Sequence, residues 1–195
     1  LGQGTDIVPG EQVDATLNPA NQTLVYHFDA VAGERFWFDR LARSGGDVYW
    51  RLLDPHGQPV WGPTYFDYDY QVGTRTLDQT GRYTLLVEGR YYTSGSVDVS
   101  FRVQPVVDEQ LGLDLNTRTS GAIDHVGQRD FYHFTLTETK RVYFDSQSAD
   151  YYLRWALSGP QGTLVANQPL RDSDSVDNLF LLELIPGDYT LTLHG

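Results

Sequence analysis

Two similar stretches of this 195-residue chain decide its fold, LVYHF at residues 24–28 and DFYHF at residues 130–134. They lie 106 residues apart, and GRYTL at residues 81–85 returns at the same offset as GDYTL at residues 187–191. Segments that recur in the same order at one offset are the signature of internal repeats. The sequence therefore predicts two homologous domains.

Between these anchors the offset changes only in loops. DVYWR at residues 47–51 matches DYYLR at residues 150–154 at an offset of 103, which predicts a shorter preceding loop in the second copy. The following turn, PHG at residues 55–57, matches PQG at residues 160–162 at an offset of 105.

We expect the first domain to span residues 1–105 and the second to span residues 106–195, with a linker at the proline-containing segment 104–109. After Gly89 the first copy continues into a further strand, whereas the second copy stops at the equivalent Gly195. We therefore expect the second domain to be truncated before its last strand. An unpaired strand edge of this kind is a site for pairing with another chain.

Local patterns indicate β-structure almost throughout. Apolar residues alternate with period two along the predicted strands, and turn segments rich in Gly, Pro, Asp and Asn follow every 8 to 12 residues. No window shows the periodicity of an amphipathic helix. The sequence predicts an all-β protein of two tandem antiparallel β-sandwiches.

Composition excludes several classes of partner and site. The formal net charge is −12 and the densest basic run is Lys140-Arg141, so nucleic acid and anionic membrane surfaces are poor partners. No apolar stretch approaches the roughly 20 residues that span a bilayer. With no cysteine, the chain has no disulfide, thiolate metal site or cysteine nucleophile. The chain begins at Leu1, and we expect it to be part of a longer protein with covalently attached neighbouring domains.

Three motifs in order, once per copy, resemble the bacterial pre-peptidase C-terminal domain. They are the Asp-x-Tyr-x-Phe strand at Asp130, the Leu-x-Asp-Pro-x-Gly-like turn at Asp54, and the Gly-x-Tyr-x-Leu strands that begin at Gly81 and Gly187. The copies depart from the pattern at Leu24 and Gly159, where the family has Asp. The resemblance implies jelly-roll-like, non-catalytic modules attached to secreted or cell-surface bacterial proteins, often proteases. Related collagen-binding modules attach their enzymes to a substrate and hold calcium.

No catalytic signature is present. The sequence lacks a Gly-x-Ser-x-Gly elbow, a His-Glu-x-x-His pair and a phosphate-binding loop. His27 and His133 occupy the same repeat position between core-type aromatic residues. Because fold-determined positions recur while active sites rarely duplicate, we interpret both histidines as structural or surface residues.

Paired carboxylates form the candidate metal sites. At an offset of 105, Asp67 and Asp69 coincide with Asp172 and Asp174, and Asp177 adds a further oxygen ligand in the second copy. Two carboxylates at i and i+2 in a loop can converge on calcium, which takes six to eight oxygen ligands. The alternative is that an acidic surface scatters Asp pairs into loops without any metal.

Aromatic residues form the candidate ligand site. Trp61, Tyr65, Tyr68 and Tyr70 crowd one segment of the first copy, and Tyr91 and Tyr92 another, whereas the second copy has no aromatic residue at the positions equivalent to the first four. Exposed aromatic faces stack on sugars or pack on proteins. Alternate residues of a sandwich strand must face the core, so we expect about half of this set to be buried.

The sequence therefore favours a non-catalytic accessory module that attaches or positions a larger secreted or surface protein on a glycan or an extracellular matrix protein. The alternative is an architectural spacer or adhesin stalk that is stiffened by calcium and has no ligand.

Overall fold

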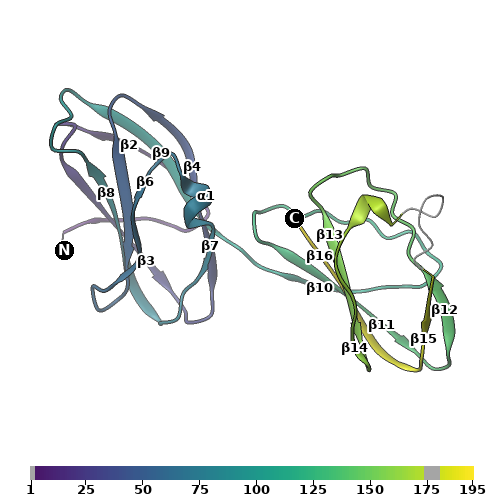
Figure 1. Ribbon diagram of the computed structural model, residues 1–195. Coiled ribbons are helices and arrows are strands. Elements are labelled where there is room, and N and C mark those ends of the chain that lie inside the picture. Colours follow the sequence, from purple (N-terminus) through teal and green to yellow (C-terminus); the bar gives the residue numbers. More distant parts are fainter. Residues whose placement is uncertain (1–2, 174–180) are drawn as a thin grey trace. The chain divides into compact units, whose positions relative to one another are not determined.

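The computed structural model describes residues 3–173 and 181–195 of the chain. The chain divides into two compact units, unit 1 (Leu1–Val106) and unit 2 (Val107–Gly195). Both units are built of β-strands packed as sheets, so the protein is all-β as predicted (Figure 1).

Unit 1 is a sandwich of two sheets. The first sheet has the strand order β1-β3-β8-β5-β6 and the second β2-β9-β4-β7. The only parallel pair is β1 with β3, and all other pairs described in unit 1 are antiparallel. The elements are β1 Thr5–Asp6, β2 Gln12–Leu17, β3 Thr23–Ala30, β4 Arg35–Ser44, β5 Val48–Leu53, β6 Pro59–Tyr65, α1 Asp69–Val72, β7 Thr74–Thr76, β8 Gly81–Gly89 and β9 Val97–Pro105.

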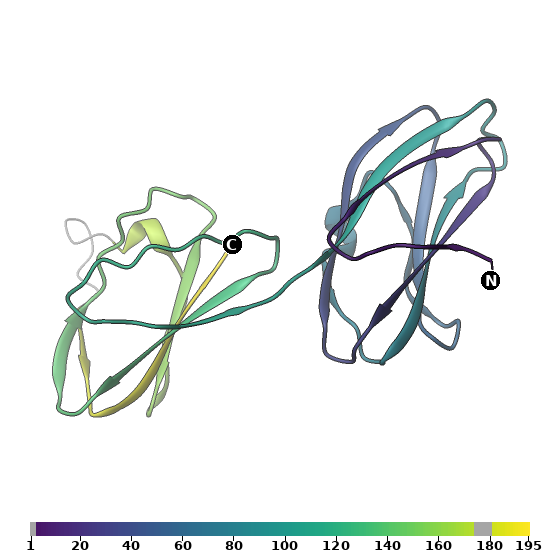
Figure 2. The same cartoon turned by 180° about the vertical axis from the view of Figure 1, so that it is seen from behind.

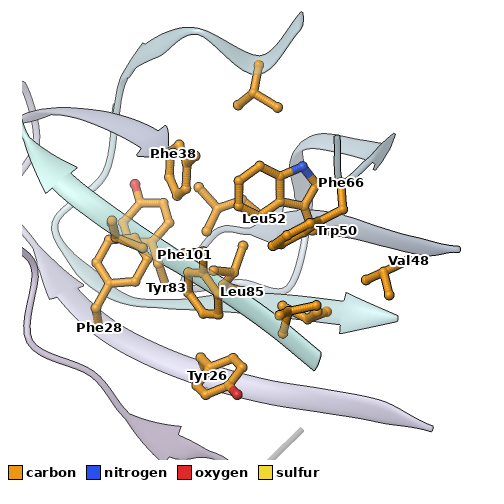
Figure 3. Packing of buried hydrophobic residues seen from close by; sticks show 14 of the residues in the cluster. Tyr26, Phe28, Phe38, Val48, Trp50, Leu52, Phe66, Tyr83, Leu85 and Phe101 are labelled. Atoms are coloured by element: carbon orange, nitrogen blue, oxygen red, sulfur yellow. The ribbon is translucent and has the colours of Figure 1, made fainter. Parts of the chain in front are cut away.

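The core of unit 1 is aromatic and lies between the two sheets. Trp50 on β5 is fully buried, and its ring centroid lies 4.7 Å from that of Phe66 and 6.3 Å from that of Phe101 on β9. Figure 3 shows this cluster, in which the ring of Tyr26, from the same sheet as Trp50, lies 5.3 Å from that of Phe101 on the opposite sheet. The period-two pattern of the sequence therefore produces one continuous interior.

Unit 2 repeats the first sheet of unit 1 with the order β10-β11-β16-β13-β14, again with one parallel pair, β10 with β11. Its second sheet contains only β12 and β15 among the described residues. Figure 2 shows this small sheet at one side of unit 2. The elements are β10 Glu109–Gly112, β11 Arg129–Leu136, β12 Lys140–Tyr143, β13 Arg154–Gly159, β14 Gly162–Pro169, η1 Leu170–Asp172, β15 Leu181–Leu184 and β16 Gly187–His194.

The Gly-x-Tyr motif closes the sandwich in both units. Gly81 and Gly187 have positive φ angles of 148° and 144°, and a Cβ at either position would meet the turn proline, Pro55 or Pro160. Two residues after each glycine, the tyrosine hydroxyl donates to the carbonyl oxygen four residues upstream, at 2.8 Å in each unit. The motif is therefore a packing and hydrogen-bonding requirement of the fold.

Strand pairing corrects two of the predicted sequence offsets between equivalent residues of the two units. Trp50 lies opposite Val87 and Trp155 opposite Leu193, so these tryptophans are equivalent at an offset of 105, not 103. The amide of Phe66 donates to the carbonyl oxygen of Val48, and the amide of Leu170 donates to the carbonyl oxygen of Leu153. Since Val48 and Leu153 are equivalent at the same offset of 105, Phe66 is equivalent to Leu170, and the offset at the ends of β6 and β14 is 104.

The cause of the second shift lies in the connection between two strands. In unit 1 this connection lies between Leu53 and Pro59, the last residue of β5 and the first of β6. In unit 2 it lies between Gly159 and Gly162, the last residue of β13 and the first of β14. The register partners Leu53 and Pro59 are one residue further apart along the chain than Ser158 and Thr163. The positions from this connection to the ends of β6 and β14 are therefore displaced by one residue.

Candidate functional site

Six tyrosines of unit 1 form a continuous surface row, which we call the tyrosine row: Tyr70, Tyr68, Tyr65, Tyr49, Tyr92 and Tyr91. Neighbouring ring centroids lie 5.1–5.7 Å apart, except between Tyr49 and Tyr92. There the Arg90 guanidinium bridges the two rings, with its central carbon 4.6 Å from one and 5.6 Å from the other. Four of the rings are exposed, from 46% at Tyr68 to 85% at Tyr91, so the row offers aromatic surface to a ligand.

Trp61, predicted to belong to this surface, lies in the core instead. It is only 7% exposed, and its ring centroid lies 5.0 Å from that of Phe38. The reason is an irregularity of β6 at Gly62, whose φ is 92° and where a Cβ would lie 2.6 Å from the Cβ of Arg51. This bulge reverses the alternation, so Trp61 faces inward while Tyr65 faces outward.

Asp47 connects two parts of the tyrosine row. Its carboxylate accepts hydrogen bonds from the hydroxyls of Tyr65, at 2.7 Å, and Tyr92, at 3.1 Å. The bond from Tyr65 holds the pKa of Asp47 below its usual value and raises the pKa of Tyr65 to about 12. Near neutral pH the carboxylate is therefore charged and Tyr65 keeps its proton, so both hydrogen bonds persist.

Beneath the row, Asp67 is held by two arginines. Both guanidinium groups, of Arg40 and Arg43, donate to its carboxylate, and Arg43 also lies over the ring of Tyr65 at 5.6 Å. The hydrogen bond from Arg43 lowers the pKa of Asp67. This network fixes the segment after β6 against β4 and so positions the exposed tyrosines.

One end of the row borders a surface hollow of about 250 Å³. Its polar wall is an ion pair in which Arg51 Nε donates to Glu88 Oε2 at 2.7 Å. Aromatic and cationic groups complete the lining, which consists of Tyr49, Arg51, Pro63, Glu88, Gly89, Arg90 and Tyr91. The hollow therefore combines ring faces with hydrogen-bond donors and acceptors, an arrangement suited to orienting a polar ligand.

The predicted metal ligands do not converge in the part of the chain that the structure describes. Asp67 is engaged by arginines, Asp69 accepts bonds from the backbone amides of Tyr70 and Arg40, and Asp172 pairs with its neighbour Arg171. Asp174 and Asp177 lie outside the described residues. Within residues 3–173 and 181–195, no three His, Asp or Glu side chains are grouped to hold a metal.

The corrected offset also removes the coincidence that suggested calcium. At an offset of 104, Asp67 corresponds to Arg171 and not to Asp172. The argument from a repeated carboxylate pair therefore no longer applies, and calcium binding stays a prediction that no observation described here supports.

The described residues of unit 2 form no tyrosine row. By strand register the positions of Tyr49 and Tyr65 are taken by Arg154 and Pro169. The exposed Tyr151 and Tyr152 of unit 2 contact each other, and Arg171 lies over the first ring at 4.0 Å. The fold of unit 2 thus forms without such a row. The tyrosines of the row therefore differ from the buried aromatic residues that the fold requires.

The repeated histidines have structural partners. His27 Nδ1 lies 3.1 Å from Thr84 Oγ1, and His133 Nδ1 lies 3.1 Å from Thr190 Oγ1. Sequence reasoning missed Tyr49, Arg51 and Arg90 as members of the site. For Tyr49 a signal existed, because it lies between the core residues Val48 and Trp50 and must therefore face outward.

No protein-family model matches the chain, and no curated protein matches it. Among solved structures, the chain is similar to PliG of Salmonella Typhimurium, a periplasmic inhibitor of g-type lysozyme. The match has 16% sequence identity, covers 53% of this chain and 100% of PliG, and has a TM-score of 0.32. The resemblance to pre-peptidase C-terminal domains stays a prediction.

Proposed function

We propose that this chain is a non-catalytic binding module and that unit 1 binds a glycan through the tyrosine row and the adjoining hollow. The observation that carries the proposal is the continuity of the row, which puts four exposed rings on one surface of unit 1 and ends at a polar hollow. The module would attach or position a larger secreted or cell-surface protein, as the resemblance implies.

The chemistry of the row favours a sugar over a flat apolar partner. Tyrosine combines an apolar ring face, on which the C–H groups of a pyranose stack, with a hydroxyl that hydrogen-bonds. In the hollow, Arg51 supplies donors and Glu88 supplies acceptors side by side, which matches the alternating demands of neighbouring sugar hydroxyls. A large apolar patch, as in many protein interfaces, would not need this ion pair.

Rigidity adds to the proposal. Asp47 fixes two of the tyrosine hydroxyls, and Arg90 lies between two rings, so part of the row is ordered before any ligand arrives. A preformed site loses less side-chain entropy on binding.

Among the residues that the structure describes, no helix is long and apolar enough to cross a membrane.

The test is binding of the full chain to insoluble cellulose, chitin and peptidoglycan and to an array of oligosaccharides. A Tyr68→Ala, Tyr70→Ala double variant should bind more weakly, with each lost ring contributing about 0.5–1.5 kcal/mol, or about two- to tenfold. Tyr151→Ala, Tyr152→Ala in unit 2 is the matched control, because those two rings also contact each other and are at least as exposed as Tyr68 and Tyr70. Equal losses in both variants, or no glycan bound by the parent chain, would refute the proposal.

A further inference from the structure

The hollow at the end of the tyrosine row carries an excess of positive charge. Its charged lining residues are Arg51, Glu88 and Arg90, two cations against one anion, on a chain whose formal net charge is −12. A concave site with walls of low dielectric constant concentrates the field of its charges. The hollow therefore attracts an anion, although the protein as a whole repels one.

Arg90 is a half-buried cation that has no carboxylate partner in the described part of the chain. There its enclosed Nε has no hydrogen-bond partner, and its guanidinium forms no ion pair. The guanidinium instead lies over the rings of Tyr49 and Tyr92. Charged side chains that leave water are as a rule paired, because desolvation of a lone charge is costly. Arg90 therefore differs from a structural arginine and is suited to an anion that a ligand supplies.

The neighbouring carboxylate of Asp47 does not satisfy Arg90. Its oxygens accept the hydroxyls of Tyr65, at 2.7 Å, and Tyr92, at 3.1 Å. These two hydrogen bonds are the main reason why the pKa of Asp47 is lowered, and the charges of Arg43 and Arg90 add smaller contributions. Arg90 thus acts on Asp47 through space alone, and its terminal N–H groups stay available to another acceptor.

Arg51 also has unused donors. Its Nε donates to Glu88 Oε2 at 2.7 Å, and its guanidinium makes no other hydrogen bond to the described residues. A guanidinium carries several further N–H donors in a fixed fork. By strand register, Ala156 and His194 take the positions of Arg51 and Glu88 in unit 2. This ion pair is therefore not a requirement of the fold.

We propose that the glycan bound by unit 1 contains an acidic sugar, and that Arg90 and Arg51 bind the carboxylate of this sugar in the hollow. The inference rests on the proposed function and adds the class of sugar to it. A guanidinium donates two parallel N–H bonds to a carboxylate, a geometry that a neutral hydroxyl cannot match.

The size and lining of the hollow suit one sugar residue. Its volume of about 250 Å³ is smaller than the roughly 300–1,000 Å³ of sites for drug-sized ligands. The rings of Tyr49 and Tyr91 in its lining supply faces on which a pyranose stacks. The acidic sugar would therefore occupy the hollow, and its neighbours would lie along the tyrosine row.

The charges favour one carboxylate over a densely charged polymer. Glu88 lies in the same wall and repels a second anion placed close to the first. Outside the hollow the net charge of −12 opposes a chain of sulfates or phosphates, although salt screens this repulsion beyond about 8 Å. A single carboxylate gains the attraction of both arginines with little of that repulsion. We therefore expect an oligosaccharide with one uronic acid and neutral neighbours.

The experiment compares each acidic ligand with a neutral copy of itself. Trisaccharides that end in glucuronate, galacturonate or mannuronate, and their carboxyl methyl esters, are titrated into the full chain by calorimetry. A heparin hexasaccharide is the sulfated probe. We expect one of the acids to bind at least about tenfold more tightly than its ester, because hydrogen bonds to charged groups are the stronger kind. Heparin should bind more weakly than that acid.

Three variants test whether the hollow holds the carboxylate. Arg90→Gln should remove the preference for the acid while binding of the ester persists, which shows that the row is intact. Arg82→Gln is the matched control, because Arg82 lies on β8 like Glu88 but pairs with the exposed Asp6 outside the hollow. It changes the net charge equally, and the preference should stay. Glu88→Gln should increase the preference, since it removes the anion from the wall, and misfolding cannot produce a gain.

Equal binding of every acid and its ester, an unchanged preference in Arg90→Gln, or a reduced preference in Glu88→Gln would overturn the inference. Tighter binding of heparin than of every acid would also overturn it, because the anion would then be a sulfate. These results leave the proposed function standing if the Tyr68→Ala, Tyr70→Ala variant binds the neutral ligands more weakly. Absence of binding to all of the saccharides would refute the proposed function itself, and the inference with it.

Discussion

Removal of the Phe101 ring is the most direct test of how unit 1 is held together. Phe101 is fully buried on β9, and its ring packs on Tyr26, Trp50 and Phe66 at centroid distances of 5.3, 6.3 and 6.4 Å. It is therefore a main contact between β9 and the aromatic core. Truncation of such a phenylalanine to alanine costs about 3–5 kcal/mol, the sum of lost burial and the cavity left behind.

This cost translates into a large shift of the melting temperature. An unfolding entropy of about 2.1 cal/mol/K per residue gives about 0.22 kcal/mol/K for the 106 residues of unit 1, so the Phe101→Ala variant should melt about 13–22 °C lower. The free energy of unfolding itself is measured in urea by tryptophan fluorescence, since Trp37, Trp50 and Trp61 all lie in unit 1.

The matched control is Tyr91→Ala, which removes another aromatic ring from the same unit. Tyr91 is 85% exposed, so the substitution should change the free energy of unfolding by less than about 0.5 kcal/mol. The unfolding of unit 2, followed at Trp155, should be unaffected by either change. A loss below about 1.5 kcal/mol in Phe101→Ala would refute the view that β9 carries the centre of this core.

Three further predictions address other parts of the molecule. Asp67→Asn should destabilise unit 1 by about 1–2 kcal/mol near neutral pH, because two partly buried arginines lose their anion. The pKa of Asp67 in the folded protein is lowered from its usual 3.8, so this stabilisation is complete above pH 3.8 and is lost as the pH falls through the folded pKa. The free energies of unfolding of the two proteins in urea should therefore converge at acid pH. A difference that stays constant with pH would contradict the assignment. Ser173→Ala should destabilise unit 2 by about 1–3 kcal/mol, because Trp155 Nε1 loses its 2.6 Å acceptor inside the core. Adding Trp155→Phe to that variant should then cost less than Trp155→Phe alone, and additive costs in the double-mutant cycle would count against the hydrogen bond. Gly187→Ala should lower the melting temperature of unit 2 more than Gly57→Ala lowers that of unit 1. A Cβ at Gly187 would lie 2.2 Å from Pro160 Cγ, whereas a Cβ at Gly57 would meet no atom within 4 Å. Equal shifts would show that the positive φ angle alone sets the cost.

The repeated motifs were the part of the fold that the sequence could predict. Gly81 and Tyr83 recur as Gly187 and Tyr189 because the glycine must pass a turn proline and the tyrosine must reach a carbonyl four residues back. Such requirements act on single residues at fixed spacing, so they remain visible in a sequence. The all-β class followed from them and from the period-two alternation of the strands.

The candidate site was harder to predict because it depends on irregular geometry. Trp61 and Tyr65 have the same parity along the sequence, but the bulge at Gly62 turns one inward and the other outward. One additional residue in the β5–β6 connection displaced the comparison between the units and created the apparent match of Asp67 with Asp172. Both effects arise from single residues in loops and bulges, where sequence patterns carry little information.

Comparison of the two units separates the residues that build this fold from those available for binding, provided that hydrogen bonds define the alignment. Trp50 and Trp155 are equivalent by register and buried in both units, so an indole at this position belongs to the fold. Tyr49 has Arg154 in its place, so nothing in the fold demands an aromatic ring there. A tyrosine row that the fold does not need is therefore the feature on which the proposal of a glycan ligand rests.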